Sequence, residues 1–505
     1  MNKSHSLHSS LLRFTYFIKT WPVYLLLLPV FFVLHGFNRN YNSVTAAEAL
    51  VLTLLYLAAT LIIAGISWLI YRDLAKSCLI AFFIMAWHFF FGNMQDALKD
   101  LSPQTFVSQY RFMLPAAFLL FLALAIWLKR RKRSFQRVIS YLNIVLLVCL
   151  LIDTTRLAVN LSYPPKNKTL NPATVTYTIC DTCKKPDIYL LLFDQYAGNT
   201  ALKEVFNFDN TAFKDELERR GFFFTMNSIS NYNLTPFSMA SILNMDYLTP
   251  EMGVKKNLNV GYCYRMISKS HVLQLLRENG YLLHNYSVFD FPGQQGKKYG
   301  AFFPYGQDLI SMPTFTSRLT RDIRSDILHG KFGFKGIQKK IAYEYLYFND
   351  KIFDLTRQIA DRQASSPRFI YSHFIMPHYP YYFDSKGQPV PLEKLTVPKI
   401  TTSQDYIEYL QYCNARILEL VDHVMKVSPA PPVILLLSDH GFRHPEKEID
   451  RRYDFMNLNA IYIPGKNYSQ FSDSVSTVNQ FRKVFNTCLG QHFPLLKDST
   501  IDLWD

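Results

Sequence analysis

The chain of 505 residues is both apolar and basic: 49% of its residues are hydrophobic, only 18% are charged, and the formal net charge is +15. This composition excludes a disordered chain or a single ordinary soluble domain, and leaves a membrane protein with basic flanks or a nucleic-acid binder. Residues 1–160 hold 15 basic and 5 acidic residues, against 39 and 34 in the remainder. Because the basic excess is concentrated in the most apolar third, the charges favour a membrane protein and argue against nucleic acid as a partner.

The amino-terminal third, residues 1–160, is predicted to be a bundle of five membrane-spanning helices. A span needs roughly 20 mostly apolar residues. The candidates are Trp21–Phe37, Ala46–Tyr71, Cys78–Gly92, Phe112–Leu128 and Val138–Val159. The first lacks a small-residue cleavage site and four further spans follow it, so it is not a cleaved signal peptide. The third is the shortest, and without it the large domain would lie on the other side of the membrane.

Charges in the loops predict the orientation of this bundle. The loop between the fourth and fifth spans contains the basic run 129–133, the loop between the second and third contains Arg72 and Lys76, and the amino terminus is also basic. The positive-inside rule therefore places the amino terminus in the cytoplasm and everything after about residue 160 outside, in the periplasm or the extracellular space. The run 129–133 could also be a nucleic-acid patch, but its apolar flanks favour a cytoplasmic loop. His88 is either a functional intramembrane histidine or a hydrated one near the end of its span.

Residues 161–186 have the composition of a linker, with several prolines and threonines and no sustained periodicity. Near its end stands Cys180-Asp181-Thr182-Cys183. No second CxxC completes a zinc site, and the outer compartment favours oxidation. We expect a small structural disulfide, with two free thiols as the alternative.

Residues 187–505 are predicted to form an α/β domain. Three apolar runs, 187–193, 368–376 and 432–437, have the pattern of buried strands. Helical stretches lie at about Asp209–Arg220, Ser268–Asn279, Tyr343–Asp361 and Ser403–Val427. This alternation predicts a mostly parallel sheet with helices on both faces. The aromatic residues of the helix at 343–361 could face lipid, but packing on the sheet is favoured.

Polar residues follow each of the three predicted strands. Asp194 follows the first, His378 comes shortly after the second, and Asp439 and His440 follow the third. Ligands of such sheets bind beyond the carboxyl ends of the strands, and carboxylates and imidazoles bind zinc, manganese or magnesium. Each residue could instead belong to an ordinary turn, with Gly441 supplying a special backbone angle. Their shared position favours a metal site.

A candidate nucleophile lies at the start of a predicted helix. Thr235 has the properties of an N-cap, and Pro236 those of a first helical residue. The threonine could be only a cap. A helix amino terminus also binds anions, and a hydroxyl bound to a divalent metal there can lose its proton and attack phosphorus or sulfur. Ser238 and Ser241 lie further along the helix and are less well placed.

The order of these parts resembles a known family. A multi-span bundle is followed by Pro-Asp-Ile-Tyr-x4-Asp at 186–194, a threonine at a helix start, Pro377-His378, and Ser-Asp-His-Gly at 438–441. This is similar to the sulfatase-like hydrolases and transferases of the alkaline phosphatase superfamily. Its membrane members include lipoteichoic acid synthases and lipid A phosphoethanolamine transferases. The resemblance covers about residues 186–465, and the five-span organisation matches it as well.

The resemblance implies roles for these residues. Asp194, Asp439 and His440 correspond to metal ligands, and Thr235 to a nucleophile that is phosphorylated and also contacts the metal. His378 corresponds to a histidine that contacts substrate or a second metal, and could protonate a leaving oxygen. Arg443 and His444 are further candidates for binding substrate; Arg443 could form a two-pronged contact with a phosphate, or be a surface arginine.

Two departures from the family pattern refine the expected activity. The helix start lacks the Cys/Ser-x-Pro-x-Arg motif of true sulfatases, which disfavours sulfatase activity. The transferases usually keep one more histidine beyond the Asp-His, but here only His444 is near and residues 450–453 contain none. Gln195 also stands where a second acid could have served. Both features favour one divalent metal ion (zinc or manganese, with magnesium as the alternative) over two.

We therefore expect a membrane-bound transferase that moves a phospho-headgroup from a phospholipid donor to an envelope glycan or lipid. The alternatives are an ester hydrolase of the same superfamily and a non-catalytic assembly or binding protein with the same fold.

Overall fold

The computed structural model describes residues 16–41, 44–101, 106–132, 134–162, 177, 179–180, 182–248, 260–297, 304, 306–397, 402–443 and 449–503. The chain divides into two compact units. The first, called here the membrane unit, comprises residues 1–168 and 304–324; the second, the outer unit, comprises residues 169–303 and 325–505. The predicted linker lies largely outside the described residues.

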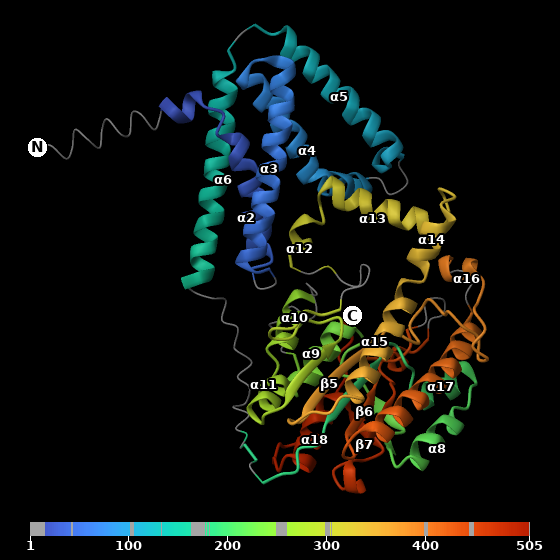
Figure 1. Cartoon of the computed structure of the whole chain (residues 1–505). Helices are drawn as coiled ribbons and strands as arrows, with labels where there is room; N and C mark the ends of the chain where they lie inside the picture. The colour runs from blue at the N-terminus through green and yellow to red at the C-terminus, as the bar shows by residue number, and fades with distance from the viewer. Residues whose placement is uncertain are drawn as a thin grey trace, which may run out of the picture. The chain divides into compact units, whose positions relative to one another are not determined.

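The membrane unit contains the predicted apolar helices (Figure 1). They are α2 (Tyr24–Arg39), α3 (Ala46–Tyr71), α4 (Leu74–Leu101), α5 (Tyr110–Arg130) and α6 (Gln136–Ser162). Among the described residues, four helices, α3 to α6, are long and apolar enough to cross a membrane. The second span has the predicted bounds, and the third is longer than predicted. The first, α2, has only 16 residues, so five spans remain a prediction.

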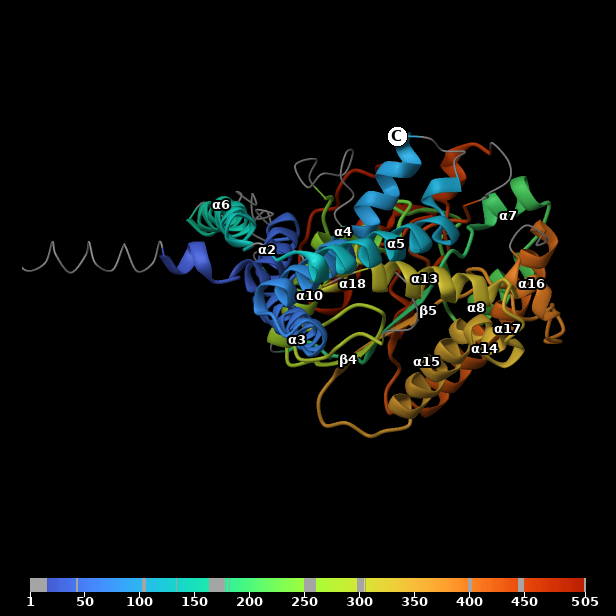
Figure 2. The ribbon, with the colours of Figure 1, turned by 90° about the horizontal axis from the view of Figure 1, so that it is seen from above.

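A break in the chain explains why α2 is short. Residues 16–20 are helical, but Trp21 and Pro22 are not, and α2 begins at Tyr24. The side chain of Asn143, in α6, lies at this break: its Nδ2 donates to Ile18 O (2.6 Å) and Trp21 O (2.8 Å), and Tyr24 N donates to its Oδ1 (2.6 Å). In an apolar environment, interrupted backbone groups need such partners. Asn143 therefore joins the two helical pieces to α6, beside which α2 runs (Figure 2).

The outer unit is built on a six-stranded sheet in the order β2-β7-β6-β1-β5-β4. The strands are β1 (Ile188–Phe193), β2 (Phe223–Phe224), β4 (Leu282–Tyr286), β5 (Arg368–Phe374), β6 (Val433–Leu437) and β7 (Asn459–Tyr462). Strands β6, β1, β5 and β4 pair in parallel. Strand β7 pairs antiparallel with β6, and β2 pairs antiparallel with β7. The sheet is therefore mixed, with the predicted parallel part at its centre. A second, two-stranded sheet pairs β3 (Asn227–Ile229) with β8 (Ser474–Ser476).

Helices flank the sheet (Figure 1). They are α7 (Asn199–Phe206), α8 (Thr211–Arg219), α9 (Thr235–Asn244), α10 (Val260–Ser268), α11 (His271–Glu278), α14 (Lys335–Ala342), α15 (Glu344–Ala360), α16 (Leu392–Thr396), α17 (Ser403–Val427) and α18 (Gln480–Cys488). Every residue of β1 and β6 is buried, as the continuous apolar runs predict. The aromatic helix α15 buries Phe348 and Phe353 in the core beside β5, so the prediction that it packs on the sheet is confirmed.

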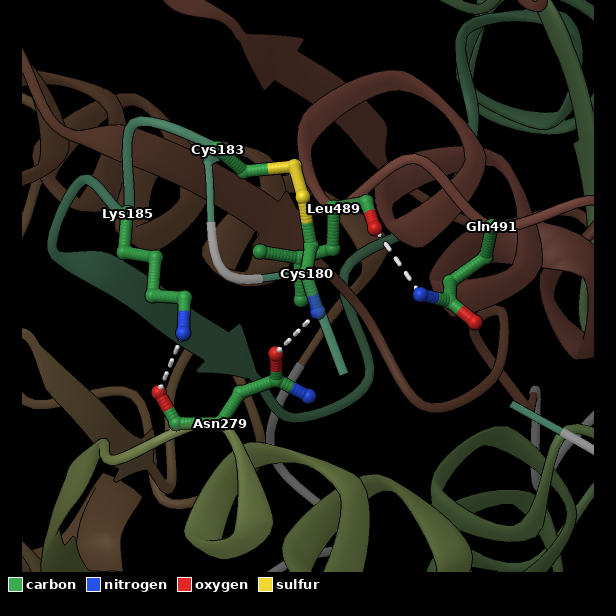
Figure 3. The surroundings of a disulfide bond; sticks show 6 residues. All are labelled: Cys180, Cys183, Lys185, Asn279, Leu489 and Gln491. Atoms are coloured by element: carbon green, nitrogen blue, oxygen red, sulfur yellow. Dashed lines mark hydrogen bonds between the residues drawn. A yellow bond between two sulfur atoms is a disulfide. The ribbon is translucent and has the colours of Figure 1, made fainter. Parts of the chain in front are cut away.

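The two cysteines of the CxxC sequence form a disulfide, which confirms the structural reading of that motif (Figure 3). Cys180 N donates to the side chain of Asn279, and Lys185 Nζ donates to the main-chain oxygen of the same residue. Asn279 ends α11 and precedes β4. The disulfide therefore fastens the start of the outer unit near the amino ends of the parallel strands, at the edge opposite the candidate site.

Candidate functional site

Three predicted ligands meet at the carboxyl ends of two adjacent strands. β1 and β6 pair in parallel, with Leu192 opposite Leu437, so the residues that follow them meet at one edge. Asp194, Asp439 and His440 are all buried and offer ligand atoms within 4.8 Å of one another. His440 Nε2 lies 3.3 Å from Asp439 Oδ2 and 3.9 Å from Asp194 Oδ1.

The polar atoms of this cluster fit a divalent metal ion. Both carboxylate oxygens of Asp194, Oδ2 of Asp439 and Nε2 of His440 are buried without a hydrogen-bond partner among the described residues. Such atoms are costly unless something binds them. His440 Nδ1 lies 2.8 Å from Gly441 O, which requires the proton on Nδ1 and leaves the Nε2 lone pair facing the carboxylates. One imidazole and two carboxylates form a donor set suited to zinc or manganese.

A histidine that the sequence reasoning did not select joins the cluster. His373, in β5, is fully buried, and its Nε2 lies 3.9 Å from Asp194 Oδ2. Burial by itself would raise the pKa of Asp194, but the nearby His373 and the charges of His378 and His440 hold that pKa below its ordinary value. The only sequence signal for His373 was a histidine inside a mostly apolar strand, four residues before Pro377.

His378 is half-buried after β5, with Nδ1 2.6 Å from Tyr379 O. Its charge contributes to the lowered pKa of Asp194. Burial lowers the pKa of His440; Asp439 opposes this shift and the positive Arg443 adds to it. The Nε of Arg443 is buried without a partner among the described residues. His444 lies outside the described residues.

Thr235 is buried at the beginning of α9, but not as its N-cap. The cap is Leu234, whose backbone is extended, so Thr235 is the first helical residue and Pro236 the second; the prediction was wrong by one position. Pro236 fits there because the amide groups of the first helical turn lack intrahelical acceptors. The helix has no side-chain cap, so the Thr235 hydroxyl is not used in that way. In contrast, Ser238 Oγ donates to Tyr232 O and Ser241 Oγ to Asp246 O.

One stretch of chain, residues 454–458, hydrogen-bonds to the loops that carry the candidate residues. The bonds are Ser230 N to Phe455 O (2.7 Å), Gly198 N to Met456 O (2.9 Å), Ser438 N to Leu458 O (2.9 Å), Leu458 N to Tyr196 O (3.2 Å) and Gly441 N to Asp454 O (2.7 Å). Gly441 is required by this close approach, since a Cβ there would lie 2.2 Å from Tyr453 O. Gly441 does not have a positive φ, so it does not supply the special backbone angle considered from the sequence. Glycine is needed at this position because there is no space for a side chain.

The turn after Asp194 is held from α17. Gln195 adopts a left-handed backbone (φ 64°), which is unusual for a residue other than glycine. The hydroxyl of Tyr406 donates to Gln195 O (3.0 Å) and accepts from Ala197 N (3.0 Å). Gln195 N in turn donates to Asp439 Oδ1 (3.2 Å). The two carboxylates are thus connected through one turn whose shape Tyr406 maintains.

Comparison with known proteins gives a family match over the part of the chain that contains the site. The model of the Sulfatase family matches residues 200–479. Among solved structures, the periplasmic domain of EptC from Escherichia coli is 11% identical with a TM-score of 0.39, the alignment covering 63% of this chain and 90% of that one. The periplasmic domain of the phosphoethanolamine transferase EptC from Campylobacter jejuni is 12% identical (60% and 90% covered, TM-score 0.36). A putative sulfatase from Bacteroides thetaiotaomicron is also 12% identical (63% and 73% covered, TM-score 0.37). No curated protein matches the sequence.

Proposed function

This chain belongs to the sulfatase family, and we propose that it is a membrane-bound transferase that moves a phospho-headgroup, of phosphoethanolamine or phosphoglycerol type, from a lipid to an envelope glycan or lipid. Its family makes it an enzyme, a hydrolase or a transferase, rather than a non-catalytic assembly protein. The observation that carries the proposal is the buried Asp194–Asp439–His440 cluster with its unpartnered polar atoms. The four apolar helices favour a donor that is itself a lipid.

In this proposal Asp194, Asp439, His440 and the Thr235 hydroxyl hold one divalent ion, zinc or manganese. Such an ion lowers the pKa of a bound hydroxyl and neutralises charge on the transferred phosphoryl group. His373 and the Tyr406-braced turn orient the Asp194 carboxylate. Arg443, whose Nε is buried without a described partner, is placed to bind a phosphate oxygen.

The reaction proceeds in two displacements at phosphorus. In the first, Thr235 Oγ1 loses its proton to solvent and bonds to phosphorus, while the bond from phosphorus to the diacylglycerol oxygen breaks. His378 gives a proton to that leaving oxygen. In the second, His378 takes a proton from the acceptor hydroxyl, whose oxygen bonds to phosphorus as the bond to Thr235 breaks. Thr235 Oγ1 then takes back a proton from solvent. Water as the acceptor makes the same enzyme a hydrolase.

We further propose that the outer unit lies outside the cell membrane, in the periplasm or extracellular space, with five spans and a cytoplasmic amino terminus. The distribution of basic loops supports this orientation. Residues 16–39, joined at their break by Asn143, supply the length that α2 alone lacks.

The decisive experiment is intact-mass analysis of the full-length protein in detergent, loaded with zinc or manganese, after incubation with phosphatidylethanolamine or phosphatidylglycerol. We expect an adduct of one headgroup phosphate that is absent from Thr235→Ala, whose turnover falls at least about 10³-fold. Ser238→Ala is the matched control, because its hydroxyl is already engaged by Tyr232 O. Headgroup release without added acceptor identifies a hydrolase. A metal-loaded, folded wild type that forms no adduct and turns over neither lipid would overturn the proposal.

A further inference from the structure

A segment from the outer part of the sequence belongs to the membrane unit. Residues 304–324 follow the outer unit's strand β4 in sequence, yet they cluster with the membrane helices. The segment contains α12 (Asp308–Ser311) and the beginning of α13 (Phe315–Leu328). We call residues 306–324 the strap. The chain therefore passes between the two units at three places: after residue 168, after residue 303 and after residue 324.

Two glycines of the membrane helices allow the strap to approach closely. A Cβ on Gly36, in α2, would lie 2.7 Å from Ile310 Cγ2, and Ile310 is 2% exposed. A Cβ on Gly92, in α4, would lie 2.7 Å from Pro313 O, to which Gly92 N donates a hydrogen bond. Distances this short leave no room for any side chain. At these two positions the strap is therefore in direct contact with the helices.

Charged and aromatic side chains also connect the strap to helices α4 and α5. The guanidinium of Arg318 donates two hydrogen bonds to the carboxylate of Asp96, in α4. Tyr110, at the start of α5, donates its hydroxyl proton to Asp322 (2.8 Å). The ring of Phe315 lies 4.6 Å from Trp87 and 5.1 Å from Phe91, between centroids. A two-pronged arginine–carboxylate pair fixes orientation as well as distance.

These contacts fall at one end of the bundle. They involve the last turn of α2, the beginning of α3 (Glu48, beside Gly306), the carboxyl-terminal part of α4 and the first residue of α5. Successive helices alternate in direction in the predicted topology, so these are all ends on the outer side. The strap therefore meets the bundle at its outer ends.

We propose that the strap is a second, non-covalent anchor that holds the outer unit to the membrane unit independently of the linker at 161–186. With the linker as the only connection, the outer unit could move over a wide volume. A docked strap, continuous with the outer unit at both of its ends, restricts that volume. Docking of the strap depends on its packing and not on the reaction catalysed.

The test is to cut the linker and ask whether the outer unit stays bound. A site-specific protease sequence is inserted within residues 163–176 of the full-length protein, which is cleaved in native membranes and washed in high salt. We expect the fragment that carries the outer unit and the strap to remain with the membranes. Gly92→Leu, whose side chain would occupy the place of the Pro313 main chain, should release about tenfold more fragment into the wash. Gly65→Leu in α3 is the matched control, because nothing lies within 4 Å of a Cβ there.

A charge exchange separates loss of docking from loss of folding. Asp96→Arg and Arg318→Asp should each increase release, and the double variant should restore retention, because the pair is re-formed with its charges reversed. Wild-type fragment that leaves the membrane as readily as the Gly92→Leu fragment would overturn the proposal. So would full retention in Gly92→Leu and Asp96→Arg, since the fragment would then bind the membrane by other means.

Discussion

Each unit contains a buried aspartate, and the two have opposite surroundings. Asp153, in α6, is 3% exposed; its Oδ2 lies 3.2 Å from His35 Nδ1 and its Oδ1 accepts from Asn38 Nδ2. Asp439 is fully buried, its Oδ2 has no partner among the described residues, and its neighbour is the carboxylate of Asp194. A buried acid whose oxygens are all engaged joins helices together. A buried acid that faces another acid is a ligand site, because the protein alone does not compensate its charge.

The largest effect is expected from replacing Asp439, whose Oδ2 has no partner among the described residues. Asp439→Asn should lower metal affinity at least about 100-fold and turnover at least about 10³-fold. The same change should stabilise the metal-free protein by about 1 kcal/mol, because two carboxylates no longer face each other. Isothermal titration calorimetry measures the metal affinity. Thermal unfolding of the protein in the presence of a chelator measures the stability of the metal-free form.

Asp153→Asn makes the same substitution at the aspartate whose oxygens are engaged, and serves as the comparison for Asp439→Asn. Asp153→Asn should destabilise the metal-free protein by about 1 kcal/mol, because the carboxylate that contacts His35 is removed. It should leave metal affinity unchanged. If both substitutions shift unfolding in the same direction, the distinction between the two aspartates fails.

The same contrast explains what could be predicted from the sequence. Asp194, Asp439 and His440 were predictable because each directly follows an apolar strand, and parallel strands end at a common edge. His373 was not, since it lies within its strand and carries no boundary signal. The strap gave no periodic signal that connects residues 306–324 with Gly36 and Gly92. Where distant backbones approach closely, the only trace in the sequence is a single glycine. Such a glycine is not diagnostic, because glycines also occur in a sequence for other reasons.

An intermediate effect is expected at the helix break in the membrane unit. Asn143→Leu removes three hydrogen bonds to the backbone at residues 18–24, and leaves those groups unpaired in an apolar environment. We expect a loss of about 2 kcal/mol in unfolding free energy in detergent micelles. Thr60→Val is the control, because the hydroxyl of Thr60 donates within its own helix, to Tyr56 O. Equal losses in the two variants would show that Asn143 does not join α2 to α6.

The smallest effect is expected from a residue that acts on the site through another. Tyr406→Phe removes only the hydroxyl that links Gln195 O to Ala197 N, and leaves the ring in the core. Without that link the left-handed turn at Gln195 is free to relax, and the Asp194 carboxylate loses its fixed direction. We expect metal affinity to fall about tenfold, with a changed visible spectrum of the cobalt-substituted protein and little change in the unfolding temperature of the metal-free form.

Tyr409→Phe makes this last prediction specific. Tyr409 lies one turn further along α17, is equally buried, and its hydroxyl has no hydrogen-bond partner among the described residues. Its removal deletes the same atom from the same helix without affecting the turn after Asp194. Metal affinity and the cobalt spectrum should therefore match those of the wild type. If the two variants lose metal affinity equally, the effect comes from general packing of α17, and the shape of the Asp194 turn is set by the sheet alone.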